Sequence, residues 1–157
     1  MKTITGKYLS SILMGLAALL LATACYSQEE FLEAELSGGP EYKPNFMEPD
    51  ELLQLIKDKS EAIVIVDTAP AMQWEEEHIV GAISFPWVAN VTPPIALPRN
   101  KTLVLYCPCT GDDADAIDMA KKLRMFGYFN TKILRGGWFE WEELGYPIES
   151  IDSEEDA

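Results

Sequence analysis

Residues 101–127 read KTLVLYCPCTGDDADAIDMAKKLRMFG and join an apolar run to an amphipathic one through a loop with two cysteines. The run LVLY at 103–106 is short, apolar and continuous, which is typical of a strand buried on both faces. Residues 112–126 place apolar side chains at helical spacing, and Gly127 is a common helix terminator. A buried strand followed at once by a helix is the repeating unit of an α/β fold.

The same alternation continues on both sides of this segment. Strands separated by helices favour parallel pairing under helical layers. We therefore predict an α/β domain whose central, mostly parallel sheet of about five strands is flanked by helices on both faces. The proline-rich residues 91–100 are predicted to be a loop. The other predicted strands are 62–67, 81–86 and 130–136, and the other predicted helices are 48–59, 71–79 and 137–145.

The N-terminal residues have the three-part layout of a secretory signal. Lys2 and Lys7 precede an apolar run at 12–21, and small residues follow before Cys25. The ending LATAC resembles a bacterial lipobox, which implies a lipid on Cys25. We predict a lipoprotein signal peptide over 1–24, while an ordinary signal peptide and an uncleaved anchor stay open as alternatives.

The predicted signal is followed by a lipidated N-terminus and flexible linker over 25–45, a domain over 46–149 and an acidic tail over 150–157. The expected location is therefore outside the cytoplasm, on a bacterial membrane facing the periplasm or the cell exterior, with the membrane contacted through the lipid on Cys25. The formal net charge of −14 disfavours nucleic acid as a partner. We expect a monomer.

Three segments in order resemble the rhodanese domain. They are IVIVDTAPAMQWEEEHIVGAISFPW at 63–87, TLVLYC at 102–107 and ILRGGWFEWEELGYPIE at 133–149, and the resemblance covers about residues 46–149. It implies that Cys107 ends a central parallel strand, at the edge where open α/β sheets bind ligands. It also implies that this cysteine accepts a sulfane sulfur as a persulfide and passes it to a thiol or cyanide.

The resemblance implies a sulfur-binding loop between the strand and the helix, in which main-chain N–H groups stabilise a thiolate or persulfide. Cys107 is then the nucleophile. Cys109 is a candidate resolving thiol, a disulfide partner of Cys107 or an unrelated loop thiol. The candidate substrate-binding loop is Pro108, Cys109, Thr110, Gly111, Asp112 and Asp113.

The loop departs from the family pattern in its charge. No arginine lies between Cys107 and Lys121, so phosphatase chemistry is not expected. The loop and first helical turn instead carry Asp112, Asp113 and Asp115, which we interpret as N-terminal helix caps and dipole partners. The same acids repel thiosulfate, so the sequence favours a neutral or cationic sulfur carrier, a protein persulfide or redox chemistry between the two cysteines.

Other conspicuous residues are interpreted as structural. His78 is the single histidine of the chain and is assigned to a turn, so no metal site is predicted, and no cofactor is expected. The aromatic residues Trp138, Phe139 and Trp141 are predicted to pack in the core and at its rim rather than to form a ligand cage. Gly136 and Gly137 are expected to allow a close backbone approach beside the loop.

Three hypotheses follow for function. The first is a sulfurtransferase or persulfide carrier that uses Cys107, whose sulfur donor and thiol acceptor the sequence does not identify. The second is a thiol–disulfide redox module that uses Cys107 and Cys109. The third is a binding domain that keeps the fold without its chemistry.

Overall fold

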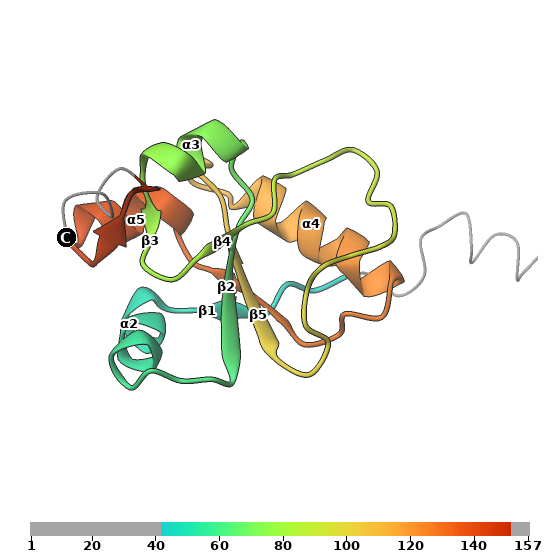
Figure 1. Ribbon diagram of the computed structural model, residues 1–157, viewed down its shortest axis with the longest axis horizontal. Helices are drawn as coiled ribbons and strands as arrows, with labels where there is room; N and C mark the ends of the chain where they lie inside the picture. Colours follow the sequence, from blue (N-terminus) through green and yellow to red (C-terminus); the bar gives the residue numbers. More distant parts are fainter. Residues whose placement is uncertain (1–41, 152–157) are drawn as a thin grey trace, which may run out of the picture. The chain divides into compact units, whose positions relative to one another are not determined.

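A computed structural model describes residues 42–151 (Figure 1). The predicted signal peptide, the lipid site Cys25 and nearly all of the 25–45 linker lie outside the described residues. So do residues 152–157 of the acidic tail. The described part contains the whole of the predicted α/β domain.

A five-stranded parallel sheet forms the centre, in the order β1-β6-β5-β2-β4. The predicted mostly parallel sheet is therefore confirmed. The central position of β5 comes from its parallel pairing with β2 on one side and β6 on the other. The strands are β1 (Phe46–Met47), β2 (Ile63–Asp67), β4 (Ile83–Ser84), β5 (Thr102–Tyr106) and β6 (Thr131–Leu134).

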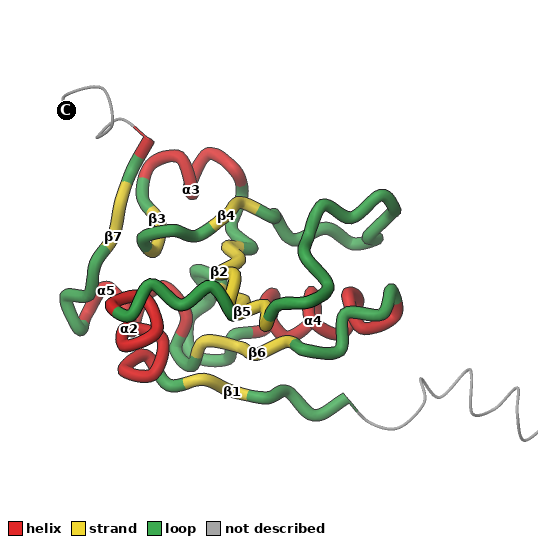
Figure 2. Tube along the Cα trace, turned by 60° about the horizontal axis from the view of Figure 1, so that its bottom comes forward, coloured by secondary structure: helices red, strands yellow, loops and turns green. Residues whose placement is uncertain are grey.

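Helices cover both faces of this sheet. Helix α4 lies on one face, whereas α2 and α5 lie on the other (Figures 1 and 2). The α2 sequence explains its start, because Pro49 is at the first helical position and Asp50 and Glu51 follow in the first turn. None of the helices within 42–151 is long and apolar enough to cross a membrane. The helices are α2 (Pro49–Lys57), α3 (Ala71–Glu76), α4 (Ala114–Met125) and α5 (Gly137–Glu143).

The core follows from the period-two alternation of the strands. Val104 and Tyr106 of β5 face α2 and α5 and pack in one cluster with Leu52 and Trp141, all of them buried. Leu103 and the other alternate residues of β5 point to the opposite face, where α4 packs on β5 and β6. A strand buried on both faces reads as a continuous apolar run, which is why this strand was predictable.

The predicted helix over 71–79 is too long. Helix α3 ends at Glu76, and His78–Ile79 form a short strand, β3, which pairs antiparallel with β7 (Ile148–Glu149). The His78 ring explains the change of structure. Its Nδ1 donates to the Trp74 carbonyl at 2.6 Å, and its Nε2 lies 3.3 Å from the Glu149 carboxylate. His78 therefore ties α3 to the small β3–β7 sheet, which agrees with the structural role predicted for it.

Candidate functional site

The cysteine loop begins where β5 ends, at the carboxyl edge of the sheet. Cys107 is fully buried and Cys109 is partly exposed. The two sulfurs form a disulfide, and the Cα atoms are 5.3 Å apart. Of the two candidate sulfurs, only that of Cys109 therefore belongs to a residue with solvent-accessible surface.

The N-terminus of α5 approaches the loop closely. The Trp138 N–H donates to the Cys107 carbonyl at 3.0 Å. A Cβ atom on Gly137 would lie 2.4 Å from the same carbonyl oxygen, and the φ of Gly137 is +54°. Only glycine fits a left-handed conformation in such a confined place. The close backbone approach predicted from the glycine pair is therefore confirmed at Gly137.

The aspartates of the loop have separate roles. Asp113 precedes α4 with φ of +50° and forms no side-chain cap. Its left-handed backbone directs the buried carboxylate to the N–H of Gly136, 3.2 Å away, so the capping role predicted for Asp113 is wrong. Asp112 accepts from the Ala114 N–H at 3.3 Å, and Asp115 lies exposed in the first turn. These two positions keep the predicted roles at the helix start.

One carboxylate oxygen of Asp113 is buried without a hydrogen-bond partner. Burial raises the pKa of this carboxyl, and the Asp112 charge adds to the effect, while the Gly136 N–H opposes it. The charged form is therefore disfavoured in the native state, so the ionisation of Asp113 lowers stability as the pH rises above the unfolded value of 3.8.

The substitution Asp113→Asn is expected to raise the free energy of unfolding at about pH 8, because the amide keeps an acceptor for Gly136 without a buried charge. The gain should shrink as the pH falls and Asp113 of the parent becomes protonated, because its raised pKa brings protonation on at a higher pH than for an ordinary aspartate. Urea unfolding across this range measures it. Asp115→Asn is the matched control and should lose stability, since it removes an acid from the first helical turn. A difference in unfolding free energy between Asp113→Asn and the parent that does not change with pH would contradict the interpretation.

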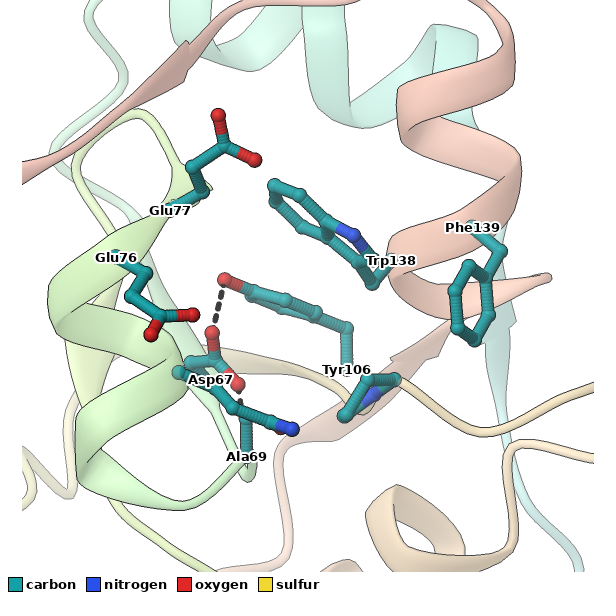
Figure 3. Close-up of a pocket in the computed structure, with 9 residues that line it drawn as sticks. Asp67, Ala69, Glu76, Glu77, Tyr106, Trp138 and Phe139 are labelled. Atoms are coloured by element: carbon teal, nitrogen blue, oxygen red, sulfur yellow. Dashed lines mark hydrogen bonds between the residues drawn. The ribbon is translucent and has the colours of Figure 1, made fainter.

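A cavity of about 220 Å³ lies beside the loop, between α3 and α5 (Figure 3). Glu76 at the end of α3 and the next residue, Glu77, lie on one side of it, and Trp138 and Phe139 of α5 lie on the other, with Tyr106 between them. The remaining lining residues are Asp67, Ala69, Gln73 and Pro108. None of the lining residues is basic.

The floor of the cavity is a buried pair from neighbouring strands. The sheet register sets Asp67 opposite Tyr106, and the Tyr106 hydroxyl donates to the Asp67 carboxylate at 2.5 Å. The second Asp67 oxygen accepts from the Ala69 N–H at 2.7 Å. Burial raises the pKa of Asp67, and burial together with the Asp67 charge raises the pKa of Tyr106. The pair fixes the two strand ends at the edge that carries Cys107.

The structure separates the three aromatic residues that the sequence grouped together. Trp141 is fully buried, and its indole N–H donates to the Pro147 carbonyl at 3.0 Å, so its predicted core role is confirmed. Trp138 and Phe139 are partly exposed and line the cavity. The prediction that they only pack at the rim is therefore incomplete.

The predicted substrate loop meets the cavity at one residue, Pro108, which lies between the two cysteines. Thr110, Gly111 and Asp112 are exposed and are not among its lining residues. Gln73 and Glu76 of α3 and the following residue, Glu77, were not predicted as site residues. The run of glutamates before His78 was visible in the sequence, but nothing in the local pattern relates it to α5. No three His, Cys, Asp or Glu residues within 42–151 are grouped to hold a metal ion.

Comparison with known proteins identifies relatives of this domain. The family model described as "Rhodanese-like domain" matches residues 48–144. An uncharacterized protein of Synechocystis is 32% identical over 101 residues, which are 63% of this chain and 52% of that protein. The chain thus spans about half the length of this curated relative.

Two solved structures are also similar. A protein of Bacillus halodurans is 26% identical with a TM-score of 0.58, over 80% of this chain and 86% of that one. A rhodanese-related protein of Thermoplasma volcanium is 22% identical with a TM-score of 0.53, over 67% of this chain and 97% of that one. The similarity to the latter concerns the fold alone.

Proposed function

Because the chain belongs to the rhodanese-like domain family, and so fits the sulfurtransferases at a coarse level, we propose that it carries sulfane sulfur on Cys107. The observation that carries the proposal is the position of Cys107. It follows the central strand β5 at the carboxyl edge of the sheet, where open α/β folds bind ligands, and Cys109 lies within bonding distance.

The first step needs the reduced protein. The Cys107 thiolate attacks the outer sulfur of a persulfide donor, R–S–SH. A bond forms between Cys107 Sγ and that sulfur, the S–S bond of the donor breaks, and the donor leaves as a thiol after it takes a proton. The product is a persulfide on Cys107.

The outer sulfur of the Cys107 persulfide can leave by two reactions. An acceptor thiol attacks the outer sulfur, becomes a persulfide itself and restores the Cys107 thiol. Alternatively, the Cys109 thiolate attacks the Cys107 Sγ, which breaks the bond to the outer sulfur and releases it as hydrosulfide. The second route ends in the Cys107–Cys109 disulfide that the structure contains.

The burial of Cys107 determines which sulfur of the disulfide is reduced first. Cys107 is inaccessible in the disulfide form, so a reducing thiol reaches the Cys109 sulfur first and Cys107 leaves as the thiolate. A second thiol of the reductant then frees Cys109, and the reductant becomes a disulfide. The exported location predicted from the sequence favours persistence of the oxidised form between cycles.

The negative charge of the loop limits which sulfur donors can approach the cysteines. Asp112 and Asp115 are exposed next to the cysteines, and the residues between Cys107 and Lys121 contain no basic side chain. A dianion such as thiosulfate is repelled there. Neutral or cationic persulfides fit the surroundings of the sulfur better.

The test is to load the reduced chain with cysteine persulfide and to measure its intact mass. In a background with Cys25→Ser and Cys109→Ser, which removes the internal route of hydrosulfide release, we expect an adduct of one sulfur atom that Cys107→Ser abolishes. Thiosulfate should load at least about tenfold more slowly, because of the neighbouring carboxylates. An adduct that survives in Cys107→Ser, or no adduct with either donor, would overturn the proposal.

A thiol–disulfide redox module is the second candidate, and the Cys107–Cys109 disulfide with its partly exposed Cys109 favours it. A redox module exchanges rapidly with dithiols and holds no stable persulfide. The loading experiment separates the two candidates, since only a sulfur carrier gains the mass of sulfur in the reduced state.

A further inference from the structure

We propose that the cavity between α3 and α5 binds a small organic cation with an alkylated ammonium group. This inference rests on the proposed function and adds the substrate class. The cation is the part of the sulfur donor or acceptor that the cavity holds beside the cysteine loop. The cavity is the one lined by Glu76, Glu77, Trp138, Phe139 and Tyr106 (Figure 3).

The aromatic side chains supply the first part of the argument. Trp138 and Phe139 from α5 line this space with two rings, and the buried ring of Tyr106 from β5 lies at its floor. A cation over an aromatic face is attracted by the ring quadrupole, most strongly at tryptophan. Alkylated ammonium groups combine this charge with apolar methyl surface, so rings satisfy both parts of such a ligand.

The carboxylates supply the second part. Neither Glu76 nor Glu77 forms an ion pair or a side-chain hydrogen bond with any residue in 42–151, whereas Glu48 and Glu51 are paired with Arg135 and Lys132. Two unpaired carboxylates therefore lie across from an aromatic wall, in a cavity whose lining contains no basic residue. Such a lining attracts cations and repels anions.

Asp67 contributes little of this charge. Asp67 is part of the cavity floor, but it is almost fully buried and its carboxylate is already hydrogen-bonded by Tyr106 and by the Ala69 N–H. Glu76 at the end of α3 and Glu77 just after it remain as the exposed charged groups that a ligand meets. The combination of these carboxylates on one side of the cavity with the α5 rings on the other defines the ligand class.

Size and position complete the argument. Sites for drug-sized ligands enclose about 300–1,000 Å³. A cavity of about 220 Å³ therefore suits a smaller molecule. Pro108 lines the cavity and is bonded on both sides to the cysteines of the disulfide. A ligand in this cavity therefore lies against the segment that carries the reactive sulfur.

The test measures binding of choline to the full chain by calorimetry, with the uncharged isostere dimethylbutanol as the comparison ligand. Choline should bind saturably, and the isostere should bind at least about tenfold more weakly, since it lacks the charge for the rings and carboxylates. Trp138→Leu should weaken choline binding about fivefold and Glu77→Gln about threefold. Glu77 is exposed, so its variant is expected to fold normally.

The matched control is Glu142→Gln, which removes the same charge from an exposed position of α5 that does not line the cavity. It should leave binding unchanged, which separates the cavity from the general attraction of a chain with net charge −14. Equal binding of the isostere, equal loss in Glu142→Gln or no binding of choline would overturn the inference. Because Cys107→Ser should still bind choline, a failure of sulfur transfer is distinguishable from a failure of the cation site.

Discussion

The Cys109→Ser protein is expected to keep the sulfur that the parent protein releases. In the proposed cycle, Cys109 attacks the Cys107 persulfide from a position only two residues away and expels hydrosulfide. A neighbouring thiol acts at an effective concentration far above that of a dissolved thiol. Its removal should therefore slow hydrosulfide release by about a hundredfold or more.

The measurement is to load reduced protein with cysteine persulfide, remove the donor, and follow intact mass and released hydrosulfide over time. The parent should lose the added sulfur and gain a disulfide, whereas Cys109→Ser should retain the added mass. Thr110→Ser, a substitution at the exposed neighbouring position, is the control and should behave as the parent. Release from Cys109→Ser at the parental rate would exclude Cys109 as the resolving thiol.

The substitution Gly137→Ala should cost the domain about 2–5 kcal/mol of unfolding free energy. The added Cβ meets the Cys107 carbonyl oxygen at 2.4 Å, and neither the central strand nor the helix can move without breaking the bond from the Trp138 N–H. The positive φ adds its own penalty, because alanine disfavours that conformation. Sulfur loading on Cys107 should fall as well, since the clash lies at the loop itself.

Gly145→Ala separates the clash from the backbone effect. Gly145 also has a positive φ, of +67°, but a Cβ there meets nothing within 4 Å. Its cost should be only about 1–2 kcal/mol, from the left-handed conformation alone. Urea unfolding of both variants gives the comparison, and equal losses would show that the approach to the Cys107 carbonyl is not tight.

The central elements were predictable because each carries its own pattern. Residues 63–66 and 103–106 are continuous apolar runs, and α4 begins and ends where acids and Gly127 indicate. Strands β1, β3 and β7 were not predicted, since each has only two residues and, unlike the equally short β4 within the predicted strand 81–86, was not recognised as part of a longer strand pattern. Their positions depend on partners far away in the chain, as the pairing of β3 with β7 shows.

The candidate site was predictable only where it follows a strand. The position of Cys107 comes directly from the end of β5, and the glycine pattern indicates the close approach of α5. Glu76 of α3 and the adjacent Glu77 face the rings of α5 only after the sheet brings the two helices together. Which side of the short helix α5 meets the core is likewise set by tertiary packing, so the different environments of Trp138 and Trp141 were not visible in the sequence.

Trp138 contacts both the cysteine loop and the cavity, since its main-chain N–H donates to the Cys107 carbonyl while its ring lines the cavity. One residue therefore contacts both the segment that carries the sulfurs and the proposed ligand site. Linkage makes this relation reciprocal: whatever factor separates ligand affinity for the dithiol and the disulfide must reappear as a shift of their midpoint potential. A ligand that binds the dithiol and the disulfide with different affinities therefore shifts the redox equilibrium of the two cysteines without contacting either sulfur.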